Sequence, residues 1–187
     1  MKNMSGAKNT TVFLISIMLL ILCAGFRRKS NIPAQDLPPK ETLNPKAKAG
    51  DTLAINFIDS QGNLISLKSF VGKVVFINLW ARWCGPCLFE TPDIHAFRQA
   101  LKGEENLLFV MLDMDGDVKR AQKFMQKQKY DLPVYVLASE LPKDWFNGAI
   151  PTTLIIDKKG VLAVKFSGAT RFNTEKMLMW MKQLINE

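Results

Sequence analysis

The chain has 187 residues, 48% of them hydrophobic, and a formal net charge of +8. Its length predicts one domain plus an additional segment, and its composition is sufficient for a hydrophobic core. The positive charge is concentrated in residues 1–50, which hold eight Lys or Arg and two Asp or Glu, whereas residues 51–187 hold seventeen and fifteen. Because the predicted domain carries little excess charge and no basic stripe interleaved with aromatics, the sequence argues against nucleic-acid binding.

The chain has three cysteines, of which only Cys84 and Cys87 lie in the predicted domain. No structural disulfide framework is therefore expected there. A zinc site would need a second pair of Cys or His ligands. The one histidine, His95, lies about 12 Å beyond Cys87 along a predicted helix, so it cannot join the two sulfurs. We expect redox chemistry and no metal.

Residues 12–26 form an almost unbroken apolar run, followed by the basic residues 27–29. The run suits the core of a signal peptide and is short for a membrane span, which needs about 20 residues. Three interpretations remain open: an uncleaved signal anchor, a signal peptide cleaved after Gly25, and a lipoprotein signal lipidated at Cys23. The last fits least well, because Leu22 stands where a small residue is usual.

Residues 27–50 contain four prolines, several lysines and few large apolar residues. This composition predicts an extended linker. We therefore divide the chain into a signal peptide or membrane anchor at 1–26, a Pro- and Lys-rich linker at 27–50 and a domain at 51–187. By the positive-inside rule, the charges that flank the apolar run either place the domain in the cytoplasm or favour neither side. Residues 27–29 carry slightly more positive charge than the residues before the run.

The domain is predicted to begin with a β-hairpin. Apolar and polar residues alternate over residues 52–57, residues 60–63 have the composition of a turn, and residues 64–67 predict a second strand. The apolar run at 74–79 predicts a buried strand.

Cys84 and Cys87 lie where this buried strand gives way to a helix. The segment from Trp80 to Cys87, Trp-Ala-Arg-Trp-Cys-Gly-Pro-Cys, leads into apolar residues at helical spacing. The N–H groups and dipole at a helix N-terminus favour a thiolate, which is the form that attacks a disulfide. Cys87 lies one turn beyond Cys84, so the two can close a small disulfide ring. Pro86 suits the first turn of a helix.

The remainder of the domain alternates strands with helices. We predict strands at 106–113, 134–137, 152–157 and 161–166, a helix from 118 to about 127, and a last helix that starts at Asn173 or Thr174. This order indicates an α/β fold with a partly parallel sheet. Met177 and Met181 recur at helical spacing in the last helix, which favours packing against the sheet over a partner surface.

These features resemble the thioredoxin superfamily, and most closely its TlpA/ResA-like branch of membrane-associated thiol–disulfide oxidoreductases. The matching features are Trp-Cys-Gly-Pro-Cys at 83–87, Glu90 and Pro92 in the pattern Cys-x-x-Glu-x-Pro, and Ile-Pro-Thr at 150–152, which resembles the cis-proline loop. The resemblance covers roughly residues 51–187. It implies a thioredoxin-like α/β fold with a central mixed β-sheet flanked by helices and an extra N-terminal β-hairpin.

The resemblance also implies roles for individual residues. Cys84 would attack a substrate disulfide, and Cys87 would then resolve the mixed disulfide. Pro151 would follow a cis peptide bond packed against the cysteines. The residues expected to contact substrate are Trp83, Gly85, Pro86 and Ile150. No cofactor is expected beyond the redox-active disulfide Cys84–Cys87.

Glu90 is expected to handle protons. It lies one helical turn after Cys87, and burial would raise its pKa so that it could exchange a proton with that thiol. The alternative is a solvated glutamate on the surface of the helix. Thioredoxins proper carry a buried aspartate where this chain has Asn78, and an asparagine cannot titrate, which favours a proton-carrying role for Glu90.

The sequence thus predicts an envelope thiol–disulfide oxidoreductase that mainly reduces disulfides in exported proteins, with apocytochrome c as one candidate. By resemblance, a membrane thiol electron donor would supply the electrons. Residues 12–26 would anchor the chain in the inner membrane with the domain in the periplasm or outside, and loss of residues 1–25 would leave it secreted. We expect a monomer.

Other functions could draw on the same residues. A copper(I)-binding chaperone could use the two soft thiolates, but such relatives usually have wider cysteine spacing and a well-placed histidine. A peroxidase would need Thr or Ser three residues before its cysteine, where this chain has Ala81. Asp113, Asp115 and Asp117 alternate as in a calcium loop, but the glutamate that ends such a loop is missing.

Overall fold

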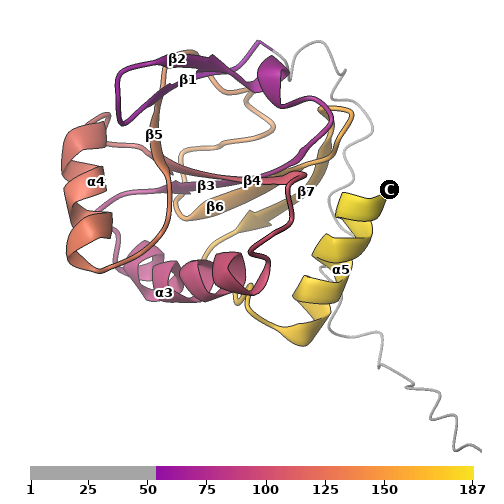
Figure 1. Cartoon of the computed structure of the whole chain (residues 1–187). Coiled ribbons are helices and arrows are strands. Elements are labelled where there is room, and N and C mark those ends of the chain that lie inside the picture. Colours follow the sequence, from indigo (N-terminus) through magenta and orange to yellow (C-terminus); the bar gives the residue numbers. More distant parts are fainter. Residues whose placement is uncertain (1–53) are drawn as a thin grey trace, which may run out of the picture. The chain divides into compact units, whose positions relative to one another are not determined.

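A computed structural model describes residues 54–187, which form a seven-stranded mixed sheet with helices packed on it (Figure 1). The sheet order is β2-β1-β5-β4-β3-β6-β7. The strands are β1 (Asn56–Asp59), β2 (Leu64–Ser66), β3 (Val74–Trp80), β4 (Leu107–Asp113), β5 (Val134–Leu137), β6 (Thr152–Ile156) and β7 (Leu162–Ser167). The helices are the 3-10 helix η2 (Leu67–Phe70), α3 (Gly85–Ala100), α4 (Val118–Lys127) and α5 (Glu175–Asn186).

Strand β3 lies inside the sheet and leads directly to the cysteines. It pairs in parallel with β4 and antiparallel with β6, and all seven of its residues are buried. The hairpin β1–β2 joins the sheet through an antiparallel pairing of β1 with β5. The predicted mixed sheet and N-terminal hairpin are therefore confirmed.

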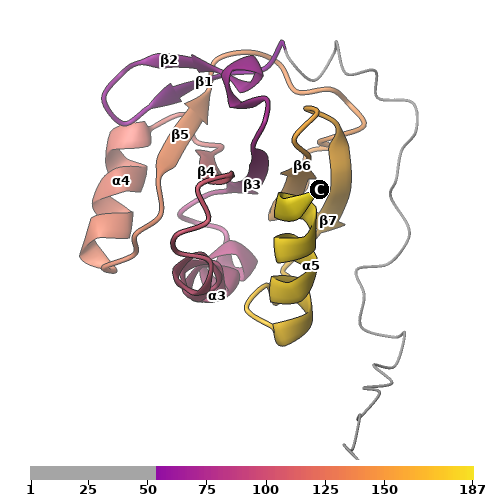
Figure 2. The ribbon, with the colours of Figure 1, turned by 45° about the vertical axis from the view of Figure 1, so that its right-hand side comes forward.

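The alternation of side chains along β3 divides the core into two clusters. Phe76 and Trp80 face the cluster to which α3, α4 and α5 contribute their buried side chains, and Figure 2 shows α3 between the other two helices. Val75 and Ile77 face the second cluster, which is completed by η2 and by Trp145 from the segment between β5 and β6. Asn78 shares the face of Phe76 and therefore points toward α3.

The element boundaries differ from the prediction mainly at the hairpin. The first strand begins at Asn56, later than predicted from alternation. Leu67 belongs to η2 and not to the second strand, because the Ser66 hydroxyl accepts the Lys68 N–H and caps a helical turn. The predicted core role of Met177 and Met181 is confirmed by their burial in α5.

The predictions for residues 1–26 and 27–50, and for the domain start at residue 51, lie outside the described residues. Within residues 54–187, no helix combines the length and the apolar character that crossing a bilayer requires.

Candidate active site

Cys84 and Cys87 are joined by a disulfide at the start of α3, with their Cα atoms 5.2 Å apart. Cys84 is the N-cap residue, and its sulfur accepts the Cys87 N–H at 3.2 Å. Both cysteines are buried, whereas Gly85 and Pro86 between them are exposed. The predicted location at a strand-to-helix junction is confirmed, and the N–H contact provides a donor for negative charge on the Cys84 sulfur.

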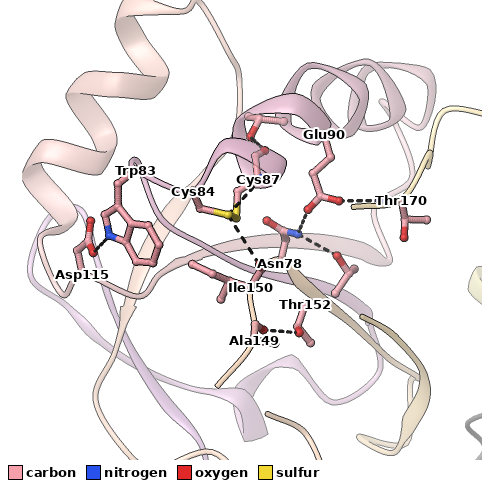
Figure 3. The surroundings of a disulfide bond; sticks show 12 residues. Asn78, Trp83, Cys84, Cys87, Glu90, Asp115, Ala149, Ile150, Thr152 and Thr170 are labelled. Atoms are coloured by element: carbon pink, nitrogen blue, oxygen red, sulfur yellow. Dashed lines mark hydrogen bonds between the residues drawn. A yellow bond between two sulfur atoms is a disulfide. The ribbon is translucent and has the colours of Figure 1, made fainter. Parts of the chain in front are cut away.

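The segment before β6 also contacts the disulfide, through the backbone of Ile150 (Figure 3). The Ile150 carbonyl oxygen lies 3.8 Å from the Cys84 sulfur. This is a contact in the oxidised protein, because a disulfide sulfur carries no hydrogen to donate. The peptide bond between Ile150 and Pro151 is cis, as the resemblance implies. Pro151 is buried, and Ile150 remains partly exposed.

Trp83 stands at the surface next to Cys84, with 71% of its surface exposed. Its indole Nε1 donates to Asp115 Oδ1 at 2.7 Å, and the Arg82 guanidinium lies 3.6 Å from the other oxygen of Asp115. Asp115 follows β4 and Trp83 follows β3, so a residue after one strand holds the tryptophan that follows the neighbouring strand. By contrast, Trp80 is fully buried.

The alternating aspartates after β4 have partners within the protein. Asp113 is buried and accepts the Asp117 N–H, and burial raises the pKa of the Asp113 carboxyl group. Asp117 is the N-cap of α4 and accepts the Arg120 N–H. These contacts account for the spacing that resembles a calcium loop.

Glu90 is buried beneath the surface of α3, with 2% of its surface exposed. Its Oε1 accepts from Asn78 Nδ2 at 2.7 Å, and its Oε2 accepts the Thr170 N–H at 3.0 Å. Burial raises its pKa from 4.5 to about 7, an effect that the two hydrogen bonds oppose and the nearby Asp93 carboxylate reinforces. The predicted rise is therefore present, and the alternative of a solvated glutamate is wrong.

Asn78 extends this network to β6, since its Nδ2 also donates to Thr153 Oγ1 at 2.9 Å. Thr153 and Thr170 were not predicted as site residues, because no local pattern marks them. They lie 75 and 80 residues away in sequence from Asn78 and Glu90. Only the folding of β6 and of the loop after β7 onto α3 brings them together.

A hollow of about 350 Å³ lies beside Glu90 and is lined in part by Phe89, Asp93 and Arg171. Phe89 is 70% exposed. The Asp93 carboxylate accepts the N–H groups of Phe172 and Asn173, which holds the same loop that contacts Glu90. The carboxyl group of Glu90 therefore lies just beneath the molecular surface, although no described hydrogen bond joins it to either sulfur.

His95 has a structural role away from the sulfurs. Its Nδ1 accepts the Asp131 N–H, and its ring lies against Tyr130 with centroids 5.3 Å apart. The described residues contain no group of three or more His, Cys, Asp or Glu side chains arranged to hold a metal ion.

A Cys-x-x-Cys disulfide at a helix N-terminus, facing a cis-proline loop over a mixed sheet, defines a thioredoxin-like redox protein. The chain belongs to the Redoxin family, which matches residues 44–178. It is a thiol–disulfide oxidoreductase of the ResA-like branch of the thioredoxin superfamily, as the sequence features predict.

Two comparisons support this assignment. A "Thiol-disulfide oxidoreductase ResA" of Bacillus cereus is 31% identical over 166 residues, which cover 86% of this chain and 90% of that protein. The crystal structure of a Bacteroides vulgatus protein described as a thiol-disulfide oxidoreductase has 28% identity and a TM-score of 0.57, covering 69% of this chain and 90% of that one.

A Chlorobium tepidum structure described as a thiol:disulfide interchange protein DsbE has 20% identity and a TM-score of 0.59, covering 72% of this chain and 96% of that one. At this identity it supports the fold alone. None of the three proteins is described as a copper carrier, so they do not favour the copper(I) chaperone.

Proposed function

We propose that this protein reduces disulfides in proteins of the cell envelope and that Cys84 and Cys87 carry out the reaction. The observation that carries the proposal is the position of Cys84 at the N-cap of α3, where its sulfur meets the Cys87 N–H at 3.2 Å. That donor and the helix dipole stabilise a thiolate once the disulfide is reduced. Cys84 is therefore the nucleophile, and the more deeply buried Cys87 is the resolving thiol.

The reaction proceeds in two exchanges. The Cys84 thiolate attacks one sulfur of the substrate disulfide, forms a mixed disulfide and releases the other substrate sulfur as a thiolate. The Cys87 thiolate then attacks the Cys84 sulfur and releases the second substrate sulfur. Two electrons pass to the substrate, and the enzyme ends with the Cys84–Cys87 disulfide, so no other cofactor is needed.

Glu90 is the proposed acceptor for the proton that Cys87 must lose before the second exchange. A carboxyl group with a pKa of about 7 binds and releases protons readily near neutral pH. Glu90 lies one turn beyond Cys87 on α3, within the buried layer that the sulfurs share. Its hydrogen bonds to Asn78 and Thr170 hold the carboxyl group in one place.

The exposed groups around Cys84 provide a surface for an extended substrate segment. Trp83 supplies an apolar face, and Gly85 and Pro86 leave the approach to the sulfur open. The Ile150 carbonyl faces Cys84 from the loop that ends in cis-Pro151, where it can accept a backbone N–H from the substrate.

The cellular setting is part of the same proposal. The resemblance to the TlpA/ResA-like branch of membrane-associated oxidoreductases and the apolar run at residues 12–26 support an inner-membrane anchor with the domain in the periplasm or outside. Loss of residues 1–25 would give a secreted form. The protein would act as a monomer, receive electrons from a membrane thiol donor and reduce exported proteins, with apocytochrome c as one candidate.

Insulin reduction by the full chain tests the proposed chemistry. Cys84→Ser should abolish it, and Cys87→Ser should trap a mixed disulfide through Cys84, because the resolving thiol is absent. Cys23→Ser is the matched control and should retain full activity. Wild-type activity in Cys84→Ser would contradict the proposal.

A further inference from the structure

The excess of positive over negative charge in the described domain comes from one segment. Residues 118–130, which contain α4, carry five Lys or Arg and no Asp or Glu. The other described residues carry twelve Lys or Arg and fourteen Asp or Glu. Without this segment, the described domain would be slightly acidic.

The lysines of α4 form one exposed face. Lys119, Lys123 and Lys127 follow each other at intervals of four residues, which places them within an arc of about 80° around the helix axis. All three are exposed, whereas Ala121 and Met125 point to the opposite side and are buried. We call these three lysines the basic face of α4.

The spacing of the basic face weakens the helix that carries it. Like charges four residues apart repel each other, whereas surface helices usually alternate the two signs at this spacing. Arg120 pairs with Asp117 at 3.1 Å, but no ion pair involves the three lysines within the part of the chain that the structure describes. An arrangement that disfavours the isolated helix is explained if an anionic partner binds to it.

Helix α4 begins on the Trp83 side of the reactive sulfur. Asp115 binds the indole of Trp83 beside Cys84, and α4 begins three residues later; Figure 3 shows both residues on the side of the disulfide opposite Glu90. A protein partner typically covers about 800 Å² of each surface, or a disc of about 16 Å radius, and α4 is about 15 Å long. A protein whose disulfide reaches Cys84 on this side therefore extends over α4.

The acidic residues between Trp83 and the basic face of α4 are already paired with arginines, so they do not repel an acidic partner. Asp115 is paired with Arg82, and Asp117 is paired with Arg120.

We propose that the basic face of α4 binds an acidic segment of the substrate protein next to the disulfide that Cys84 attacks. The inference rests on the proposed function and specifies the charge of its substrates. Attraction between the lysines and the acidic segment accelerates encounter and orients the substrate disulfide toward the active site. Salt screens this attraction.

The test uses the reduced full chain and two peptides that contain the same intramolecular disulfide. One peptide is flanked by Asp and Glu, and the other is flanked by Lys and Arg. In a single turnover the Cys84 and Cys87 thiols are oxidised to the disulfide and the peptide disulfide is reduced to two thiols, so the second-order rate constant of this exchange gives kcat/KM. At low ionic strength kcat/KM for the acidic peptide should exceed that for the basic peptide by about tenfold or more, and the two values should converge at about 0.5 M salt.

Two sets of lysine substitutions separate the effect of the basic face from the effect of net charge. Lys119→Gln, Lys123→Gln and Lys127→Gln together should remove most of the preference for the acidic peptide. The control combines Lys68→Gln, Lys159→Gln and Lys182→Gln, three exposed lysines on η2, the β6–β7 turn and α5. It loses the same charge and should keep the preference. Both triple variants should reduce a peptide with uncharged flanks at the wild-type rate.

Two results would overturn the inference: equal kcat/KM for the two peptides with the wild type, or a preference that survives in the α4 triple variant. If that variant instead keeps the preference but loses binding to phosphatidylglycerol vesicles, the basic face contacts membrane and the inference is wrong. If the wild type reduces no peptide, including the one with uncharged flanks, the proposed function fails and the inference fails with it.

Discussion

The side-chain amide of Asn78 donates to the carboxylate of Glu90 across 2.7 Å in a site where both residues are almost fully buried. A neutral amide stabilises the charged carboxylate without competing for its proton, so Glu90 is the one titrating member of a chain that runs from Thr153 through Asn78 and Glu90 to Thr170. Burial nevertheless dominates, and the pKa of Glu90 is raised to about 7.

This pKa predicts a specific dependence of stability on pH. Between about pH 4.5 and pH 7 the folded protein keeps a proton on Glu90 that the unfolded chain releases, so the free energy of unfolding falls as pH rises through this window, by about 3 kcal/mol. Above about pH 7 the contribution is constant. Urea unfolding of wild type and Glu90→Gln across this range should show that the variant lacks the fall. An identical pH slope in both proteins would show that Glu90 does not retain a proton in this range.

Asn78→Asp should destabilise the protein at neutral and alkaline pH. A second carboxylate facing Glu90 cannot ionise beside it without repulsion, so the pair would retain a proton to higher pH. We expect a loss of about 2–4 kcal/mol at about pH 8 and a much smaller loss at about pH 5. Denaturant unfolding at the two pH values measures the difference. An equal loss at both would show that packing, not charge, is responsible.

Asp115 should support substrate binding through Trp83. Asp115→Ala removes the acceptor of the indole N–H and the partner of Arg82, so KM for insulin should rise by about five- to tenfold, the equivalent of one lost hydrogen bond, with little change in kcat. Asp115→Asn removes the charge but retains an oxygen for the indole and should have a smaller effect. A fall in kcat with unchanged KM in Asp115→Ala would mean that the indole does not bind substrate.

The methionines of α5 provide a test of the core. Met181 is fully buried in the cluster beneath the helices, whereas Met179 is 46% exposed on the same helix. Met181→Ala should reduce the free energy of unfolding by about 2–4 kcal/mol, and Met179→Ala by less than about 0.5 kcal/mol. Comparable losses in the two variants would contradict the core role of Met181.

Local patterns were sufficient to predict most of this fold. The apolar run of β3 and the helical spacing of α3 each mark an element over a few residues, which is why the junction at Cys84 could be located from sequence. Leu67 was misassigned because apolar alternation does not register the Ser66 cap that turns the chain into η2. The burial of Trp145 against the second face of the sheet had no local signal either.

The environment of the site was less predictable, because its contacts join residues far apart in sequence. Glu90 could be recognised from its spacing to Cys87, but its partner Thr170 depends on how the loop after β7 returns to α3. Asp115 was noticed only as part of an alternating acidic pattern. Its contact with Trp83 requires β3 and β4 to pair in parallel, so that both strands end at the same edge of the sheet.

Whether the protein acts as a reductant depends on the reduction potential of the Cys84–Cys87 pair, which can be measured at equilibrium. The full chain would be equilibrated with dithiol buffers of known potential, and the two cysteines read by alkylation and mass spectrometry so that Cys23 does not contribute. We expect a value near that of reducing thioredoxins, about −270 mV. A value near the strong oxidants, about −120 mV, would contradict it and would mean that the protein forms disulfides.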